Sequence, residues 1–221
     1  MAYENYEKIH IEVRDGVVNA TINAPPVNVM TLGLFGELLR LGKELESDCH
    51  ARVLVLRSAD PEFFIAHFDV EAILDFPIEE EPERGARNAF HEMCECFRTM
   101  GVVTIAQIEG RVGGGGCELI SAFDMRFGVT GKTLINQMEV PIGILPGGGG
   151  TQRLPRLVGR GRALEIILGG CDLDAQTAES WGLLNRALGK EEIAPFVDSL
   201  ASRIASYPQQ AVRLAKQSVD A

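Results

Sequence analysis

The sequence predicts an α/β protein with one domain at its core. A strand–strand–helix–strand succession opens the chain, and a later unit sets a strand, a glycine-rich loop and a helix in line, "VVTIAQIEGRVGGGGCELISA". The length of 221 residues is within reach of a single domain. Because neither linker composition nor a short-period repeat divides the chain, we expect one continuous core.

The first elements follow from the spacing of apolar residues. In "KIHIEVRDGVVNATI" apolar side chains alternate on one strand, Asp15-Gly16 supplies a turn, and residues 17–22 return, which predicts a hairpin. Thr31 then caps a helix with an apolar stripe. The stripe consists of Leu34, Leu38, Leu41 and Leu45. The segment "ARVLVLRS" that follows predicts a strand buried on both faces.

The middle and the end of the chain alternate between short strands and helices. "DPEFFIAHFDVEAI" predicts a strand end, a loop and a short helix from Asp69, and "PIEEEPERG" predicts an exposed loop. Glycine and proline mark the helix breaks expected later in the chain. Further expected elements are a helix over 84–99, a strand over 102–110, a helix over 115–122, strands over 125–129 and 132–136, and then mainly helices with breaks near Gly159, Gly169-Gly170 and Pro208.

Composition and charge limit the kinds of molecule that the protein is expected to bind. The formal charge of −10 argues against nucleic acid, which needs clustered lysine and arginine. The five cysteines follow no disulfide spacing, and the polar start "MAYENYEKIH" does not resemble a signal peptide, so we expect reduced thiols and a cytoplasmic protein. No apolar run is long enough for a membrane helix. We expect no metal, since His91, Cys94 and Cys96 lack the spacing of a ligand set and favour ordinary packing.

The run "GRVGGGGCELISAFD", residues 110–124, raises the main functional question. It does not fit the dinucleotide-binding template, because Glu118 or Leu119 stands where the last glycine belongs. Gly131-Lys132-Thr133 is not a phosphate loop, since residue 126 is arginine rather than glycine. There is also no G-x-S-x-G serine motif. What remains is bare backbone at a helix start, where amide N–H groups can hold an anionic oxygen.

Two carboxylates accompany the two glycine-rich loops. Glu118 lies in the first turn of the expected helix, where it could equally well only stabilise the helix dipole. Glu139 precedes the second glycine run in "INQMEVPIGILPGGGGTQRL". Two carboxylates beside an oxyanion pocket are what proton addition and removal next to a carbonyl require, which favours acid/base chemistry at an acyl group.

These segments resemble the enoyl-CoA hydratase/isomerase (crotonase) superfamily. The resemblance is carried by "IAQIEGRVGGGGCELISAFDMRFG" and by the segment from residue 135 to residue 185, and it extends over nearly the whole chain. It implies a crotonase-like spiral of β-β-α units, an acyl-CoA thioester substrate, no cofactor apart from the coenzyme A of the substrate, and a homotrimer or dimer of trimers. It divides the chain into a core over 1–190 and a helical C-terminal segment over 191–221, the start of the trimerisation region.

The resemblance also implies roles for particular residues. The thioester oxygen would be held by the backbone N–H groups of Gly115 and Phe68, the latter in a loop aligned with the family's A-G-A-D motif. Glu118 and Glu139 match the two glutamates that hold water and handle the Cα proton. The substrate-binding residues it implies are Ala66, His67, Phe68, Asp69, Gly114, Gly115, Pro146 and Gly147.

The sequence departs from the family pattern in two places. His67 and Phe68 replace a glycine and an alanine, and a left-handed backbone at either position would be strained. His67 then faces the coenzyme A groove or solvent, or takes part in the chemistry, and Phe68 shapes the acyl pocket. The chain stops at "AKQSVDA", where family members continue with helices that cover the pocket, so we expect a shortened C-terminal part.

Several functional alternatives stay open at this point. A double-bond isomerase needs the same oxyanion pocket and often one carboxylate, and a non-catalytic acyl-CoA-binding or assembly protein could use the same fold. The arginines of "TQRLPRLVGRGR" either bind coenzyme A phosphates or lie on solvated faces and in interhelical pairs, and we favour the second interpretation.

Overall fold

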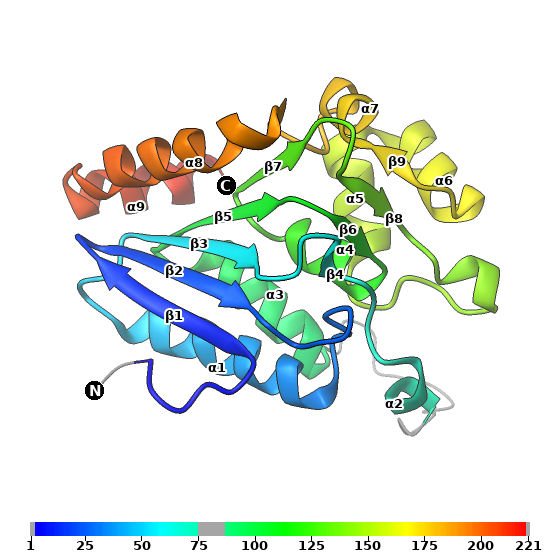
Figure 1. Ribbon diagram of the computed structural model, residues 1–221, viewed down its shortest axis with the longest axis horizontal. Coiled ribbons are helices and arrows are strands. Elements are labelled where there is room, and N and C mark those ends of the chain that lie inside the picture. Colours follow the sequence, from blue (N-terminus) through cyan, green and yellow to red (C-terminus); the bar gives the residue numbers. More distant parts are fainter. Residues whose placement is uncertain (1–2, 75–86, 220–221) are drawn as a thin grey trace.

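Alternating apolar runs in the first half of the chain form a large, mostly parallel sheet. The computed structural model describes residues 3–74 and 87–219. The large sheet has the strand order β1-β2-β3-β5-β7-β10, in which only the β1–β2 hairpin pairs antiparallel (Figure 1). Its strands are β1 (Ile9–Arg14), β2 (Val17–Ile22), β3 (Val53–Ser58), β5 (Val103–Ile108), β7 (Met125–Val129) and β10 (Arg186–Leu188).

The hairpin and the doubly buried strand are confirmed. Asp15 and Gly16 both have positive φ, of 50° and 80°, as a tight two-residue hairpin turn requires. In β3, alternate residues enter two separate apolar clusters. Leu54 and Leu56 pack in the larger cluster, and Val53 and Val55 pack in the smaller one.

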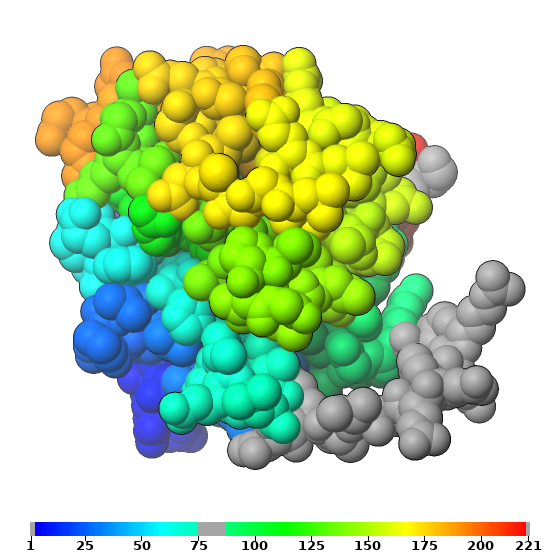
Figure 2. All heavy atoms as spheres, turned by 90° about the vertical axis from the view of Figure 1, so that its right-hand side faces the viewer, coloured from blue at the N-terminus to red at the C-terminus, as the bar shows by residue number. Residues whose placement is uncertain are grey.

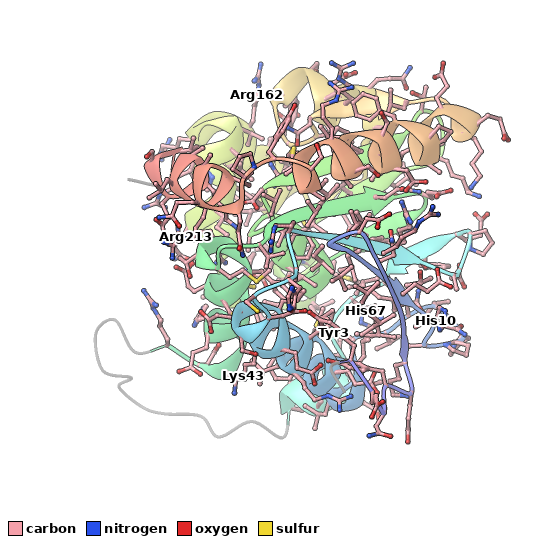
Figure 3. The ribbon with its side chains drawn as sticks, turned by 90° about the vertical axis from the view of Figure 1, so that its left-hand side faces the viewer. Tyr3, His10, Lys43, His67, Arg162 and Arg213 are labelled. Carbon is pink, nitrogen blue, oxygen red and sulfur yellow. The ribbon has the colours of Figure 1, made fainter. Side chains whose placement is uncertain are left out.

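Helices cover both faces of the large sheet. Helices α1 (Leu32–Ser47) and α3 (Ala89–Thr99) lie on the face of the larger cluster, and α8 (Lys190–Ala205) lies on the opposite face (Figures 1 and 3). The leucine stripe of α1 is fully buried, and the Thr31 side chain accepts from the amide of Leu34, so that predicted helix and its cap are confirmed.

The expected helix over 84–99 begins later than predicted. It starts at Ala89, because the Asn88 side chain accepts a hydrogen bond from the His91 amide and forms a capping box. The predicted exposed loop over 77–85 lies outside the described residues.

A smaller sheet positions the functional loops. It has the order β4-β6-β8-β9, and β4, β6 and β8 run parallel. Its strands are β4 (Phe63–Ile65), β6 (Arg111–Gly113), β8 (Leu134–Asn136) and β9 (Leu173–Asp174). Because the carboxyl ends of parallel strands meet at one edge, the segments after residues 65, 113 and 136 come together there. This convergence is the feature of the fold that builds the site.

The remaining elements surround this edge. They are α2 (Val70–Leu74), α4 (Gly115–Ile120), the 3-10 helix η1 (Val140–Ile142), α5 (Gly150–Val158), α6 (Arg160–Gly169), α7 (Ala175–Trp181) and α9 (Gln209–Val219). Figure 2 shows this end of the molecule, with segments near residues 70, 140 and 165 lying together on its surface. The expected breaks near Gly159, Gly169-Gly170 and Pro208 separate helices as predicted. The predicted boundary between 1–190 and 191–221 stays a prediction.

Helix α4, which carries Glu118, is fixed at its far end by a buried arginine. The guanidinium of Arg126 donates to the carbonyls of Ile120 at 3.2 Å, Phe123 at 2.6 Å and Leu183 at 2.7 Å. Carbonyls at a helix end lack intrahelical partners, so these bonds satisfy them. The short helix that begins in the glycine run therefore has a fixed end in the core.

Candidate active site

Three loops at the edge of the small sheet bring most of the predicted site residues together. The first follows β4 and contains Ala66 to Asp69. The second follows β6 and opens α4 at Gly115, and the third follows β8 and leads to Glu139. A β-carbon on Gly113 would lie 2.6 Å from the Ala66 carbonyl oxygen, and one on Gly115 would lie 3.0 Å from the Phe68 β-carbon. Bare backbone therefore lets the first two loops pass in contact.

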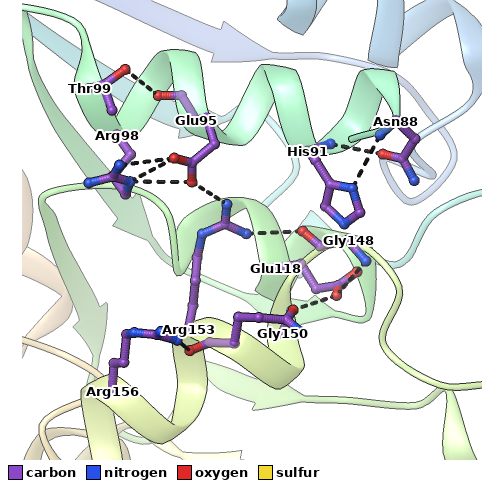
Figure 4. A network of polar contacts seen from close by, with 11 residues as sticks. Asn88, His91, Glu95, Arg98, Thr99, Glu118, Gly148, Gly150, Arg153 and Arg156 are labelled. Carbon is purple, nitrogen blue, oxygen red and sulfur yellow. Dashed lines mark hydrogen bonds and ion pairs between the residues drawn. The ribbon is translucent and has the colours of Figure 1, made fainter. Parts of the chain in front are cut away.

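Glu118 is buried and held by backbone amides of the second glycine run. Its side chain is 4% exposed overall, and its Oε1 accepts from the N–H groups of Gly148 and Gly150, both at 2.8 Å (Figure 4). A β-carbon on Gly148 would lie 2.5 Å from Oε2. The absence of side chains in the second glycine run thus allows its backbone to contact this carboxylate. The Glu118 side chain therefore contacts the loop of residues 148–150, which goes beyond stabilising the dipole of its own helix.

The environment of Glu118 favours its protonated form. Burial raises the pKa of Glu118 to about 7, and the nearby Glu139 carboxylate also raises it, while the amides of Gly150 and Gly148 and the charge of Arg153 act in the opposite direction. A carboxyl with a pKa near neutrality can both accept and return a proton at that pH. This is the property that acid/base work requires.

Glu139 lies beside the first glycine run. It precedes η1, and burial raises the pKa of its carboxyl. A β-carbon on Gly114, which has φ of 48°, would lie 3.1 Å from Oε1 of Glu139. With its nitrogen toward this carboxylate, the fully buried amide of Gln137 donates to Oε2 at 2.8 Å. Each of the two buried carboxylates therefore lies against the backbone of a glycine run, and the two interact electrostatically.

The backbone at the expected oxyanion loop carries no left-handed strain. The positive φ angles of non-glycine residues in the described chain belong to Tyr3, Asn5, Asp15 and Asn28, so His67 and Phe68 are not among them. The loop instead pairs with the preceding segment: the Met30 amide donates to the His67 carbonyl at 2.8 Å, and the Asp69 amide donates to the Met30 carbonyl at 3.1 Å. The side chains of His67 and Phe68 are thus accommodated without the strain that the sequence suggested.

His67 and Phe68 point in different directions. The His67 Nδ1 lies 2.7 Å from the Phe68 carbonyl oxygen, and the side chain lines a groove of about 450 Å³ (Figure 3). That groove is bordered by Lys8, Ala24, Pro25, Pro26, Val29, Thr31, Asp69, Val70 and Glu71. Phe68 packs edge-on against Phe35 and Phe90, with ring centroids 5.9 and 6.0 Å apart. Phe68 thus forms part of an apolar wall at Gly115.

The other predicted substrate-binding residues contribute unequally. Pro146 is buried, and a β-carbon on Gly150 would lie 3.1 Å from its Cβ, so it packs against the loop that holds Glu118. Gly147 is exposed, and a β-carbon there would meet only the Leu145 carbonyl, at 3.8 Å. Among the described residues, no atom therefore requires a glycine at position 147.

Some residues at the site were not predicted from the sequence. Gln137, Gly148 and Gly150 contact the two carboxylates. For Arg153 the sequence left open coenzyme A binding or, as the favoured interpretation, a solvated face or an interhelical pair. Arg153 does pair between helices, with Glu95 at 2.9 Å, whereas Arg156, Arg160 and Arg162 are exposed. A spacing signal for Arg153 existed: it follows the glycine run by three residues, one helical turn into α5.

A cavity of about 1190 Å³ adjoins the loop that holds Glu118. It is bordered by α3, by Gly149 and Arg153, and by α9. Among residues 3–74 and 87–219, no three His, Cys, Asp or Glu side chains gather closely enough to bind a metal ion. In the same residues, no helix combines the length and the apolar character needed to cross a bilayer.

The fold and the site define an α/β protein with a buried carboxylate pair beside a backbone-lined pocket, suited to proton transfer near an anionic oxygen. Residues 12–221 match the family model described as enoyl-CoA hydratase/isomerase. The chain belongs to this family, and its fold is the crotonase fold, as the sequence predicted.

Individual relatives agree with the family. The chain is 33% identical over 217 residues to a crotonyl-CoA hydratase of Syntrophomonas wolfei, covering 98% of this chain and 81% of that protein. It superposes on the crystal structure of a putative enoyl-CoA hydratase from Streptomyces avermitilis with a TM-score of 0.87 and 37% identity, covering 97% and 80% of the two chains. Pseudomonas aeruginosa DspI gives a TM-score of 0.87 at 30% identity, covering 98% and 87%.

Proposed function

We propose that the protein hydrates the 2,3 double bond of a 2-enoyl-CoA thioester. The observation that carries the proposal is a pair of buried carboxylates, Glu118 and Glu139, which interact electrostatically and each lie against the backbone of a glycine run. Isomerisation of a double bond often needs only one of them. A crotonyl-CoA hydratase among the relatives supports the same substrate class.

The proposed reaction divides the proton transfers between the two carboxyls. A water held between them adds its oxygen to Cβ while its proton passes to the Glu118 carboxylate. The protonated Glu139 then supplies a proton to Cα, and the enolate formed in between is stabilised by the N–H groups of Gly115 and Phe68. The pKa of Glu118, raised to about 7, and the burial that raises the pKa of Glu139 both favour carboxyls that exchange protons.

The proposal includes the partners implied by the same chemistry. Coenzyme A enters as part of the substrate, and the reaction as written requires no metal and no further cofactor. We also propose assembly into a trimer or a dimer of trimers, which light scattering on the purified protein would measure directly. A monomeric scattering mass would contradict the assembly.

The test uses a panel of 2-enoyl-CoA esters of increasing acyl length. Hydration removes the conjugated thioester absorbance and incorporates water into the product. A shifted double bond without water would assign the protein as an isomerase instead. Tight acyl-CoA binding with no reaction on any ester would favour a non-catalytic binding protein.

Substitutions at the two glutamates test their assigned roles. Glu118→Gln and Glu139→Gln should each lower hydration by about two orders of magnitude or more, because an amide keeps the shape but cannot exchange the proton. Binding of a saturated acyl-CoA, measured by calorimetry, should remain close to that of the parent protein. Near-normal turnover in both variants would remove the carboxylates from the mechanism.

A further inference from the structure

The segment that holds Glu118 is itself held from its other side. Gly148 donates its N–H to Glu118, and its own carbonyl oxygen accepts from Nη1 of Arg153 at 3.0 Å (Figure 4). One residue of the loop therefore connects the carboxylate to a guanidinium. The two hydrogen bonds of Gly148 thus couple the position of Arg153 to that of Glu118.

Arg153 is anchored to a different helix. Its Nη2 donates to Oε1 of Glu95 on α3 at 2.9 Å, and Arg98 binds the same carboxylate at 2.9 Å. The Arg153 side chain is only 13% exposed. Hydrogen bonds from Arg98 lower the pKa of Glu95; burial opposes this, and Arg153 adds to it, so Glu95 is ionised at neutral pH. A planar guanidinium can bond the loop and the helix at once, which a lysine ammonium does with less geometric control.

The glycine at the centre of the loop makes room for this contact. Gly149 has φ of 109°, and a β-carbon there would collide with the Arg153 guanidinium. Its neighbours Gly148 and Gly150 leave the same kind of space for Glu118. Three consecutive glycines therefore serve two side chains, one on each side of the loop.

Charged and titratable groups reach Glu118 from several elements. Glu139 approaches from the start of η1, Arg153 from α5 and Cys94 from α3, while Cys117 precedes it on α4. Glu95 of α3 acts on Cys94 and is bonded to Arg153. Glu139 and Arg153 act on Glu118 with opposite sign. Arg153 is thus a cation that favours the ionised form of Glu118, in a chain of net negative charge.

We propose that Arg153, anchored by Glu95, is a positioning residue for Glu118: it fixes the carbonyl of Gly148 so that the amides of Gly148 and Gly150 stay directed at the carboxylate, and its charge favours the carboxylate form. The inference rests on the proposed function in one respect, the role of Glu118 in proton transfer. The orientation of the amides and the effect of the charge are two separable contributions.

The test compares Arg153→Gln and Arg153→Lys with Arg156→Gln, a matched loss of charge one turn further along α5 on an exposed side chain. Arg153→Gln should lower kcat by about 10- to 100-fold, as a small misplacement of a reacting group does. It should also move the acid limb of the kcat/KM profile upward by about one pH unit, since a nearby cation has been lost. Arg153→Lys should restore the position of the limb but only part of kcat. Arg156→Gln should match the parent protein in both.

A second readout needs no substrate. Titration of the Glu118 carboxyl by carbon-13 NMR, assigned with Glu118→Gln, should show the same upward movement in Arg153→Gln and none in Arg156→Gln. A parent protein without turnover on any enoyl-CoA would overturn the proposed function, and the titration would still decide the inference. An unchanged Glu118 titration and limb in Arg153→Gln would overturn the inference. If Arg153→Gln does not fold, an Arg153→Lys variant with parental kcat would overturn it too.

Discussion

At the scale of single residues, the burial of Glu118 lowers the stability of the folded protein at neutral and higher pH. The pKa of Glu118 is raised from 4.5 to about 7 in the folded protein, chiefly by burial. Below the lower value the carboxyl is protonated in both the folded and the unfolded states. As the pH rises through this window the unfolded chain releases the proton first, so the free energy of unfolding falls.

Glu118→Gln should therefore stabilise the protein in a pH-dependent way. We expect its free energy of unfolding to exceed that of the parent by about 1–3 kcal/mol at about pH 8, and the difference to shrink towards about pH 4.5. Denaturant titrations across this range measure it. Glu109→Gln is a control of opposite sign, because hydrogen bonds from Lys190 and Gln107, against the effect of burial, lower the pKa of Glu109. A constant difference between Glu118→Gln and the parent at every pH would contradict the assignment.

Gly115 offers a test of the backbone donor. It is the first residue of α4, a position that tolerates proline, and proline there removes the N–H. Because a β-carbon at residue 115 would lie 3.0 Å from Cβ of Phe68, the substitution is best made in a Phe68→Ala background. Relative to that background, Gly115→Pro should lower kcat by about 100- to 1000-fold, the scale of one lost oxyanion donor.

The comparison needs variants shown to be folded by circular dichroism. Gly113→Ala separates stability from chemistry, because its β-carbon would lie 2.6 Å from both the Ala66 carbonyl oxygen and Asn136 Oδ1. That variant should lose stability while the folded fraction keeps its turnover. Parental rates in a folded Gly115→Pro protein would exclude this N–H from the mechanism.

The sequence was most informative about residues whose type is restricted by contact. The glycines beside Glu118 and Glu139 stand out in the sequence because close approach of backbone requires them. The residue types of Gln137 and Arg153 carry no such mark, since glutamine and arginine are common on solvated surfaces; only the place of Arg153 one turn after the second glycine run pointed to it. Their contacts, of Gln137 with Glu139 and of Arg153 with Glu95 on α3, are made by the tertiary structure.

At the scale of elements, long periodic segments were predicted and very short ones were not. The leucine stripe of α1 and the apolar run of β3 each have a clear period. β9 and β10 contain two and three residues, too few for alternation to be recognised, and they lay in a region expected to be helical. They pair with β8 and β7, strands distant in the chain.

The last helix, α9, is fixed to the core by one buried lysine. The Lys216 side chain is 8% exposed, and its ammonium pairs with Asp124 at 2.9 Å and donates to the Val102 carbonyl at 2.8 Å and the Phe97 carbonyl at 3.3 Å. Since these carbonyls come from the end of α3 and the start of β5, the contact joins α9 to two central elements.

Lys216→Met should lower the free energy of unfolding by about 1–3 kcal/mol, because it removes the cation paired with Asp124 and the donor to the carbonyls of Phe97 and Val102. Asp124 keeps its hydrogen bonds from the amide and the hydroxyl of Thr104. Denaturant unfolding measures the loss. Arg213→Met, on the same helix and exposed, should stay within about 0.5 kcal/mol of the parent. Equal effects of the two substitutions would show that α9 is held by its apolar contacts alone.

At the scale of the whole molecule, the site stands on the larger of the two apolar clusters. Cys94 of α3 and Cys117 of α4 both belong to that cluster, and both are fully buried. Burial raises the pKa of each thiol to about 12. Cys94 and Cys117, on whose thiols the charge of Glu118 acts, are therefore shielded from solvent and kept in the neutral thiol form.

Because they are buried, Cys94 and Cys117 can be alkylated only when the core around them opens to solvent, so their alkylation measures that opening. A maleimide reacts with thiolate, so the exposed Cys49 and Cys171 should be alkylated promptly at about pH 8. Cys94 and Cys117 should react only when local unfolding opens the larger apolar cluster, slower by about three orders of magnitude or more. Peptide mass spectrometry over time resolves the sites, and equal rates at Cys117 and Cys171 would contradict the expectation. The alkylation rate at Cys117 then measures how often the buried cluster next to Glu118 opens to solvent, in the absence of any ligand.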